Sequence, residues 1–152
     1  CPDSPQSKNP DYDIPTISTL KTVARQTPAQ LVTHREKMGG SYAYSLGYTD
    51  EKGRYQQPKN LHRTNFPVMA DAPPTENLSL ASLHHAGRGQ NVLYEDGHVQ
   101  FVTTPHLIRP YSSSPEDHLY LNDRDQPAAG MHFQDAVLGR SNQAPIRFIS
   151  SP

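Results

Sequence analysis

A chain of 152 residues with 14 basic and 15 acidic side chains has the length of one domain and a formal charge of −1. Only 34% of its residues are apolar, 15 are proline and none is tryptophan, so the hydrophobic core must be small and the loops long. The near-neutral charge, without any block of like charge, argues against a nucleic-acid or anionic-membrane surface, and no apolar run is long enough to span a bilayer.

The N-terminal segment, residues 1–15, carries four prolines among Asp, Ser and Asn, which predicts an extended arm. The single cysteine, Cys1, excludes an internal disulfide and a metal site built from several cysteines. It could be lipid-modified, act as an N-terminal nucleophile, form an intermolecular disulfide, or simply be where the sequence begins. Because the sequence starts without Met, we expect a mature product or a fragment, with any anchor or targeting segment outside it.

Residues 16–48 combine a weak helical signal with a strong strand signal. A proline interrupts the helical pattern, and a strand candidate follows at residues 31–34. The expected helical face consists of Ile17, Leu20, Val23 and Ala24. After a Gly-Gly turn, large residues alternate with small ones, which predicts a strand with one mainly aromatic face. That face consists of Tyr42, Tyr44, Leu46 and Tyr48. Such a stripe can pack a sheet face or stack on sugar rings.

The middle of the chain predicts further turns and strands. Residues 49–53 form a polar turn and residues 56–65 a loop, after which residues 66–71 form a strand that Pro67 restricts to the edge of a sheet. We expect a flexible link at residues 87–89. Beyond residue 110, short strand candidates lie at 118–121, 136–138 and 146–149.

The strongest signal is the pair Asp96-Gly97 between two β-rich runs, which predicts an antiparallel hairpin of residues 91–95 and 98–102. A two-residue type I′ loop sets the register, and that register places four apolar side chains together on one buried face. The four are Val92, Tyr94, Val99 and Phe101.

The run Asn-Val-Leu-Tyr-Glu-Asp-Gly-His-Val at residues 91–99, with a histidine before it, resembles the bacterial prepilin-type processing-associated domain. That family is named for a His, a nine-residue spacer and an Asp-Gly pair; here the spacer has ten residues. The likeness covers roughly residues 84–102, with looser likeness at 1–2, 41–44 and 67–71. It implies a β-rich, pilin-like head outside the cytoplasm, which in that family follows a hydrophobic helix absent here. The motif residues, with a structural role, are His85, Asn91, Asp96, Gly97 and His98.

Eight histidines raise the hypothesis of a metal site. The obvious set of ligands is His84, His85, Asp96 and His98. An extended strand would separate the two ends of this set by about 16 Å, so one ion cannot reach both. In the predicted register His98 faces Glu95, which favours a cross-strand pair. A site on the two adjacent histidines, alone or with His62 or His106, stays open.

Residues 122–125 (Asn-Asp-Arg-Asp) carry oxygen ligands but fail the helix-loop-helix calcium pattern. Pro127 and Ala128 stand where an acceptor and a glycine belong, and Gln134 replaces the final Glu. A looser oxygen-ligand site stays open. There is no Gly-x-Ser-x-Gly, no His-Glu-x-x-His and no glycine-rich phosphate loop followed by Lys, so we expect no catalytic residues, no cofactor and no residues that bind one.

These signals predict an α+β or mainly β fold, built on an antiparallel sheet with a central hairpin and long proline-rich loops. The expected division is an extended arm at 1–15, a β-rich pilin-like head at 16–110, and a C-terminal extension with short strands at 111–152. The arm and the chain beyond Val102 should bury little within their own domain, so we expect the arm, the C-terminal tail or both to lie on another chain or on a missing helix.

By resemblance, the expected function is that of a non-enzymatic, extracytoplasmic structural protein, pilin-like or pseudopilin-like, in the periplasm, at the cell surface or outside the cell. It would assemble with its own copies, as a homo-oligomer or filament, or with other envelope or secretion proteins. We expect no nucleic-acid partner, and contact with a membrane only through a segment absent from this sequence. The alternatives are a metal-dependent enzyme and a surface module that binds sugar or peptide.

Overall fold

A computed structural model describes residues 40–74, 81–108 and 116–141, together with Lys21, Thr22, Arg25, Thr27 and Gln143. The expected arm at 1–15, the helical face at 17–24, and the strands at 31–34 and 146–149 lie outside the described residues. No helix in the described part of the chain has the length and apolar character needed to cross a membrane.

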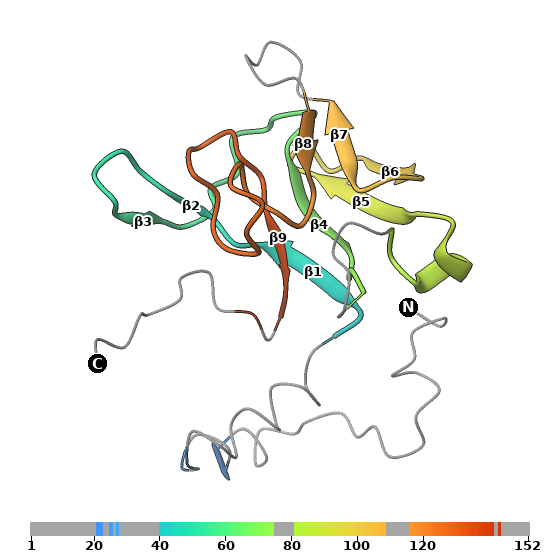
Figure 1. The fold of residues 1–152 in the computed structure, drawn as a ribbon, viewed down its shortest axis with the longest axis horizontal. Helices are drawn as coiled ribbons and strands as arrows, with labels where there is room; N and C mark the ends of the chain where they lie inside the picture. Colours follow the sequence, from blue (N-terminus) through green and yellow to red (C-terminus); the bar gives the residue numbers. More distant parts are fainter. Residues whose placement is uncertain are drawn as a thin grey trace.

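The main feature is a five-stranded antiparallel sheet with the order β6-β5-β4-β1-β9 (Figure 1). Its strands are β1 (Tyr42–Ser45), β4 (Pro67–Asp71), β5 (Gln90–Tyr94), β6 (Val99–Val102) and β9 (Leu138–Arg140). Two smaller pairs are β2 (Tyr48–Thr49) with β3 (Tyr55–Gln56), and β7 (His106–Ile108) with β8 (Glu116–His118). The 3-10 helix η2 (His84–Gly87) precedes β5. The fold is therefore mainly β, as predicted.

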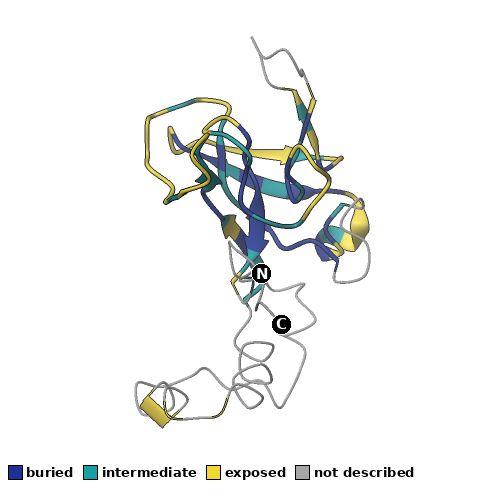
Figure 2. Ribbon diagram, turned by 60° about the vertical axis from the view of Figure 1, so that its left-hand side comes forward, coloured by how far each residue is buried: buried dark blue, intermediate teal, exposed yellow. Residues whose placement is uncertain are grey.

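The hydrophobic core lies on one side of this sheet, beneath the segment that runs from β8 to β9 (Figure 2). The core cluster consists of Ala43, Ala70, Val92, Tyr94, Leu119, Tyr120 and Leu138. The last three come from the C-terminal third of the chain, and the Tyr120 hydroxyl donates a 2.8 Å hydrogen bond to the Asp71 carbonyl beneath it. The expectation that the chain beyond Val102 buries little is therefore wrong, because this segment supplies the second layer of the core.

The β5–β6 hairpin forms where it was predicted, but its register differs by one residue. Leu93 pairs with Val99 and Asn91 with Phe101. The loop has three residues, 95–97, because the Tyr94 N–H donates to the His98 carbonyl. Within the loop, the Gly97 N–H donates to the Tyr94 carbonyl. Three-residue loops that end in a left-handed residue are a common alternative to the type I′ turn.

This one-residue shift reverses the face of the second strand, because side chains alternate along a strand. Val92 and Tyr94 are buried as predicted, but Val99 is 61% exposed and Phe101 47% exposed. The prediction that all four share one buried face is wrong for the two β6 residues. They lie on the opposite face of the sheet.

The loop geometry is explained by Glu95, whose side chain is 1% exposed. Its Oε2 accepts hydrogen bonds from the Arg63 Nε at 2.9 Å and from the backbone N–H groups of Leu61 and Arg63 at 3.1 Å each. Oε1 accepts from the Arg63 Nη2 at 2.5 Å. The predicted pair of Glu95 with His98 is wrong, because this carboxylate turns inward while His98 bonds Asp96.

Two other strand predictions need correction. Pro67 lies at the start of β4, which is a central strand between β5 and β1, and a register irregularity follows it directly. Proline fits there because the first residue of a strand and a bulge can both dispense with an N–H donor. The aromatic strand at 41–48 is interrupted at Gly47, where φ is +71° and an added Cβ would lie 2.3 Å from the Gln56 carbonyl oxygen, so β1 and β2 belong to different sheets.

Substitution of Gly97 by Val should destabilise the protein by about 1–2 kcal/mol, the usual cost of forcing a residue with a Cβ into the left-handed region. Gly97 has φ +92°, and nothing lies within 4 Å of an added Cβ, so the cost comes from the backbone alone. Gly97→Asn is the control and should cost less, because Asn tolerates positive φ. Urea denaturation of both variants measures the change in the free energy of unfolding. Equal stability of Gly97→Val and the parent would contradict the turn geometry.

Candidate functional site

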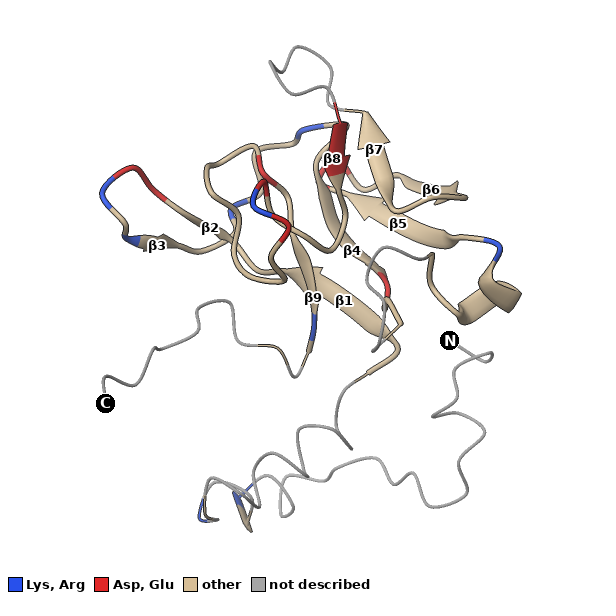
Figure 3. Cartoon of the chain, viewed as in Figure 1, with Lys and Arg blue, Asp and Glu red and all other residues tan. Residues whose placement is uncertain are grey.

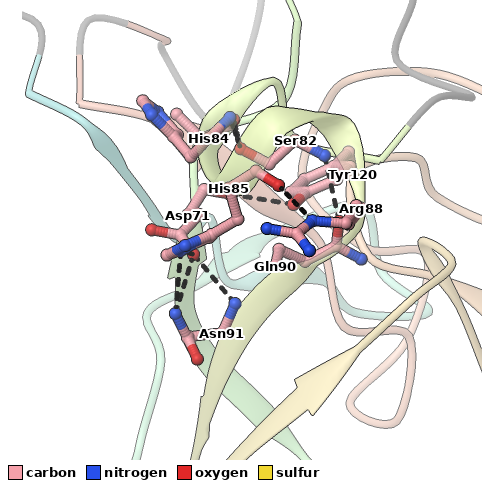
Figure 4. Close-up of polar contacts among 9 residues, drawn as sticks. Asp71, Ser82, His84, His85, Arg88, Gln90, Asn91 and Tyr120 are labelled. Atoms are coloured by element: carbon pink, nitrogen blue, oxygen red, sulfur yellow. Dashed lines mark hydrogen bonds and ion pairs between the residues drawn. The ribbon is translucent and has the colours of Figure 1, made fainter. Parts of the chain in front are cut away.

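The motif residues fall into two groups at opposite ends of β5. The first group surrounds Asp71, the last residue of β4, whose side chain is only 2% exposed. Its Oδ2 accepts hydrogen bonds from the Asn91 N–H at 2.8 Å and from the Asn91 side-chain amide at 3.2 Å, and lies 3.0 Å from the His85 Nε2 (Figure 4). One carboxylate oxygen thus joins β4, β5 and the helix η2.

The geometry of this group decides which ring nitrogen of His85 carries hydrogen. The Asn91 amide nitrogen lies 3.0 Å from the His85 Nε2, and both face the same Asp71 oxygen. With Asp71 ionised, that oxygen can only accept, so Nε2–H donates to Asp71, and the same Nε2 cannot then accept a hydrogen bond from the Asn91 amide. His85 and Ala86 both have φ +57°, a backbone conformation rarely adopted by residues with a Cβ. From this conformation the His85 side chain reaches Asp71.

A second layer of polar contacts supports this group (Figure 4). The buried Gln90 side chain accepts from the Ser82 N–H at 3.0 Å and donates to the Thr104 carbonyl at 2.8 Å. The Ser82 hydroxyl donates to the Ala72 carbonyl at 2.8 Å, so its proton is directed to a carbonyl rather than to a base. His84 is buried, and burial lowers the pKa of its imidazole. These contacts describe a structural junction.

The second motif group lies at the hairpin tip. The Asp96 Oδ1 accepts the His98 N–H at 3.1 Å and lies 2.6 Å from the His98 Nδ1. The N–H of His98, with its side chain, lowers the pKa of Asp96. The His98 ring stacks on the Tyr94 ring with centroids 4.4 Å apart. The structure does not bring Asp96 and His98 together with the two adjacent histidines.

The face of the sheet opposite the core carries a set of apolar side chains. One row follows the strand pairing across β1, β4, β5 and β6, and two further apolar residues lie in the neighbouring row, where they pair with Asp71 and Asn91. The first row is Tyr44, Met69, Leu93 and Val99, and the flanking residues are Tyr42 and Phe101. All six are half-buried or exposed, and β6 is exposed along most of its length (Figure 2). We call these six residues the open face.

The structure also groups three carboxylates that the sequence keeps apart. Acidic residues gather in β8 and in the loop that follows it (Figure 3). Within the described part of the chain, the group of at least three potential metal-ligand side chains consists of Asp117, Asp123 and Asp135. Burial raises the pKa of Asp135, although the N–H groups of Met131 and Asp123 act against it. We call these three residues the carboxylate cluster.

The nearby His118 is half-buried and does not belong to this cluster. Its Nδ1 accepts the Tyr120 N–H at 3.1 Å, and its ring lies edge-on to the His106 ring with centroids 4.9 Å apart. Burial, helped by the charge of His106, lowers the pKa of His118 to about 4.

The motif residues take part in the hydrogen bonds described above, and within the described part of the chain those bonds do not involve the open face or the carboxylate cluster. The sequence did not single out Asp71, Asp117 or Asp135, and it suggested Glu95 only as a partner of His98. The signal for Asp71 and Glu95 was a charged residue directly after a strand-like apolar run. Comparison with known proteins adds no identity, since no protein family, no curated protein and no solved structure matches the chain.

Proposed function

We propose that this chain is a non-enzymatic, extracytoplasmic structural protein of pilin-like character, which assembles through the open face of its sheet. The observation that carries the proposal is the uncovered row of apolar side chains across four adjacent strands. Contiguous apolar patches of this kind mark association surfaces more often than isolated exposed residues do. The extracytoplasmic location and the envelope or secretion setting are carried by the family resemblance alone.

A second copy of the chain is the proposed occupant of the open face. The face ends at β6, an edge strand, and an edge strand can also pair its backbone with a strand of another copy. Val99, Phe101 and Tyr44 are 61%, 47% and 45% exposed, so burying the rest of each would contribute roughly half of the ~1.5–3 kcal/mol that full burial of a large apolar side chain gives. Association costs at least about 4 kcal/mol in lost freedom, so several of the six residues must be buried together.

The polar groups of the motif support a structural rather than a catalytic role. The Asp71 oxygen that faces His85 already accepts two hydrogen bonds from Asn91, and the Ser82 hydroxyl donates to a carbonyl. A nucleophile needs a neighbouring base that can take its proton. Ser82 does not have that arrangement.

Self-association should be concentration-dependent and should weaken in the variant Phe101→Lys. A charged side chain on the open face, at the edge strand that the partner copy would cover, should lower the association constant at least about tenfold, which corresponds to about 1.4 kcal/mol. Sedimentation equilibrium across a range of concentrations measures it. The matched control is Gln100→Lys, which adds the same charge to the same exposed strand but on the other face of the sheet.

Two outcomes would contradict the proposal. One is a parent protein that stays monomeric at the highest accessible concentration. The other is an equal loss of association in Phe101→Lys and Gln100→Lys, which would indicate a general charge effect. Melting temperatures of both variants should lie near that of the parent, because Phe101 and Gln100 are both exposed.

A further inference from the structure

The carboxylate cluster brings together three positions spread over 18 residues of the chain. Asp117 lies in β8, Asp123 in the loop after it, and Asp135 shortly before β9. One carboxylate oxygen from each lies within 4.8 Å of the others. Asp117 and Asp135 are buried, at 6% and 1% exposure, whereas Asp123 is exposed. The cluster is therefore anchored in the interior and open to solvent on one side.

A separate observation points to a ligand at this position. The Oδ1 of Asp135 is buried and has no hydrogen-bond partner, whereas its Oδ2 accepts the Met131 N–H at 2.6 Å and the Asp123 N–H at 3.2 Å. A buried carboxylate oxygen without a donor is costly while the group is ionised, unless a cation is close to it. The two other carboxylates of the cluster carry negative charge of their own and so increase that cost.

The other two carboxylates are held in place by hydrogen bonds. The Asp117 Oδ1 accepts the His118 N–H at 2.9 Å, and its Oδ2 accepts the Ala136 N–H at 3.4 Å. The Asp123 Oδ2 lies 2.9 Å from the His132 Nε2, and the His132 Nδ1 accepts the Gln134 N–H at 3.2 Å. The Nε2 of His132 is therefore the donor to Asp123. Fixed carboxylates of this kind are typical of the surroundings of a bound metal ion.

We propose that Asp117, Asp123 and Asp135 bind a calcium ion. Oxygen ligands alone favour a hard cation over zinc, copper or iron, which prefer nitrogen and sulfur. Calcium–oxygen bonds of about 2.3–2.6 Å place two ligands of one ion at most about 5 Å apart, which agrees with the spread of the three oxygens. Magnesium requires shorter bonds and near-ideal octahedral geometry and gives up its water reluctantly, so three carboxylates supplied by separate segments suit the more flexible coordination of calcium better.

This site differs from the calcium loop considered from the sequence. A helix-loop-helix site takes its ligands from one continuous loop, whereas these three residues come from separate segments. The ion would connect β8, through Asp117, to the loop at Asp123 and to the chain at Asp135, just before β9. The chain between β8 and β9 covers the core, because it contains Leu119 and Tyr120 and leads into Leu138, the first residue of β9. Calcium should therefore stabilise the covering layer, independently of any assembly through the open face.

The experiment is a calcium titration of the purified full chain after treatment with a chelator. Isothermal titration should give one calcium per chain, and calcium in large excess should raise the melting temperature by about 5 °C. Asp135→Asn should weaken binding at least about tenfold, because it removes a ligand charge. Asp125→Asn is the matched control, since it removes the same charge from the same loop but lies outside the cluster.

Stability in the chelator provides a second measurement. Without calcium, Asp135→Asn should melt at or above the temperature of the parent, because an amide oxygen can accept the same two N–H bonds without a buried negative charge. With calcium, the order should reverse. Asp123→Asn, at an exposed position, is the second ligand variant and should also weaken calcium binding. It tests the site even if Asp135→Asn does not fold.

Three results would overturn the proposal. The first is the absence of a heat of binding and of any change in melting temperature when the parent is given about 10 mM calcium, a concentration well above the dissociation constants of the weakest extracellular calcium sites. The second is an equal loss of binding in Asp125→Asn and the ligand variants, which would indicate general attraction to acidic residues. The third is an equal response to magnesium, which would exclude a site selective for calcium.

Discussion

Replacement of Glu95 by Ala is expected to lower the free energy of unfolding by about 3 kcal/mol, the lower end of the usual cost of breaking a buried ion pair. The Glu95 carboxylate is 1% exposed and accepts hydrogen bonds from the Arg63 guanidinium and from two backbone N–H groups. Its loss leaves these donors unsatisfied and leaves the partly buried Arg63 without a counter-charge. Denaturation by urea measures the effect.

Two further variants serve as controls. Glu95→Gln keeps the shape and an acceptor but removes the charge, and it should cost less than Glu95→Ala. Glu51→Ala removes an exposed carboxylate from the β2–β3 turn and should cost less than about 0.5 kcal/mol. If the Glu95 and Glu51 alanine variants were equally stable, the buried pair would contribute nothing measurable.

The ion pair between Glu95 and Arg63 should also weaken in acid. Burial raises the pKa of Glu95, but the hydrogen bonds from Arg63 and Leu61 outweigh burial and lower it overall, so its contribution to stability is lost as pH falls through this lowered pKa.

The second large effect is expected for Asp71→Ala, at about 2–4 kcal/mol, because a buried charged acceptor is removed while its donors stay in the structure. The variant breaks the bonds from Asn91 and His85 to Oδ2 and releases η2 from its positive-φ conformation. The Tyr120 bond to the Asp71 backbone carbonyl should survive, since it does not involve the side chain.

Asp96→Ala provides a matched control for Asp71→Ala. Asp96 also bonds a histidine, at 2.6 Å, but it lies exposed in the hairpin loop. Its removal should cost less than about 1 kcal/mol, in the range of exposed ion pairs. Nitrogen NMR of the His85 ring provides a direct readout, because the parent should show hydrogen on Nε2. Equal costs for the two aspartates would show that burial at Asp71 adds nothing.

The sequence by itself determined the class of fold and the position of several strands, since these depend on local patterns. Alternation of side chains located β1, the apolar run at 66–71 located β4, and the Asp-Gly pair located the hairpin. The polar turn at 49–53 also forms, where the Asp50 N–H bonds the Arg54 carbonyl between β2 and β3. Each of these signals involves residues within a few positions of one another, so neighbouring residues alone define it.

The hairpin register was decided by the tertiary structure. Both a two-residue and a three-residue loop fit the residues around Gly97, and they differ by one position in the pairing. The three-residue loop lets Glu95 reach Arg63, which is 32 positions earlier in the chain. That long-range ion pair reverses the face of Val99 and Phe101 and so creates the open face on which the proposed assembly depends.

The carboxylate cluster was also decided by the tertiary structure. Residues 122–125 suggested oxygen ligands, but only Asp123 of that run belongs to the cluster. Asp117 and Asp135 lie 18 positions apart and meet because β8 pairs with β7 while β9 returns to the edge of the sheet beside β1. Local spacing carries no information about such a meeting, because the path of the chain between the two residues sets the distance between their carboxylates.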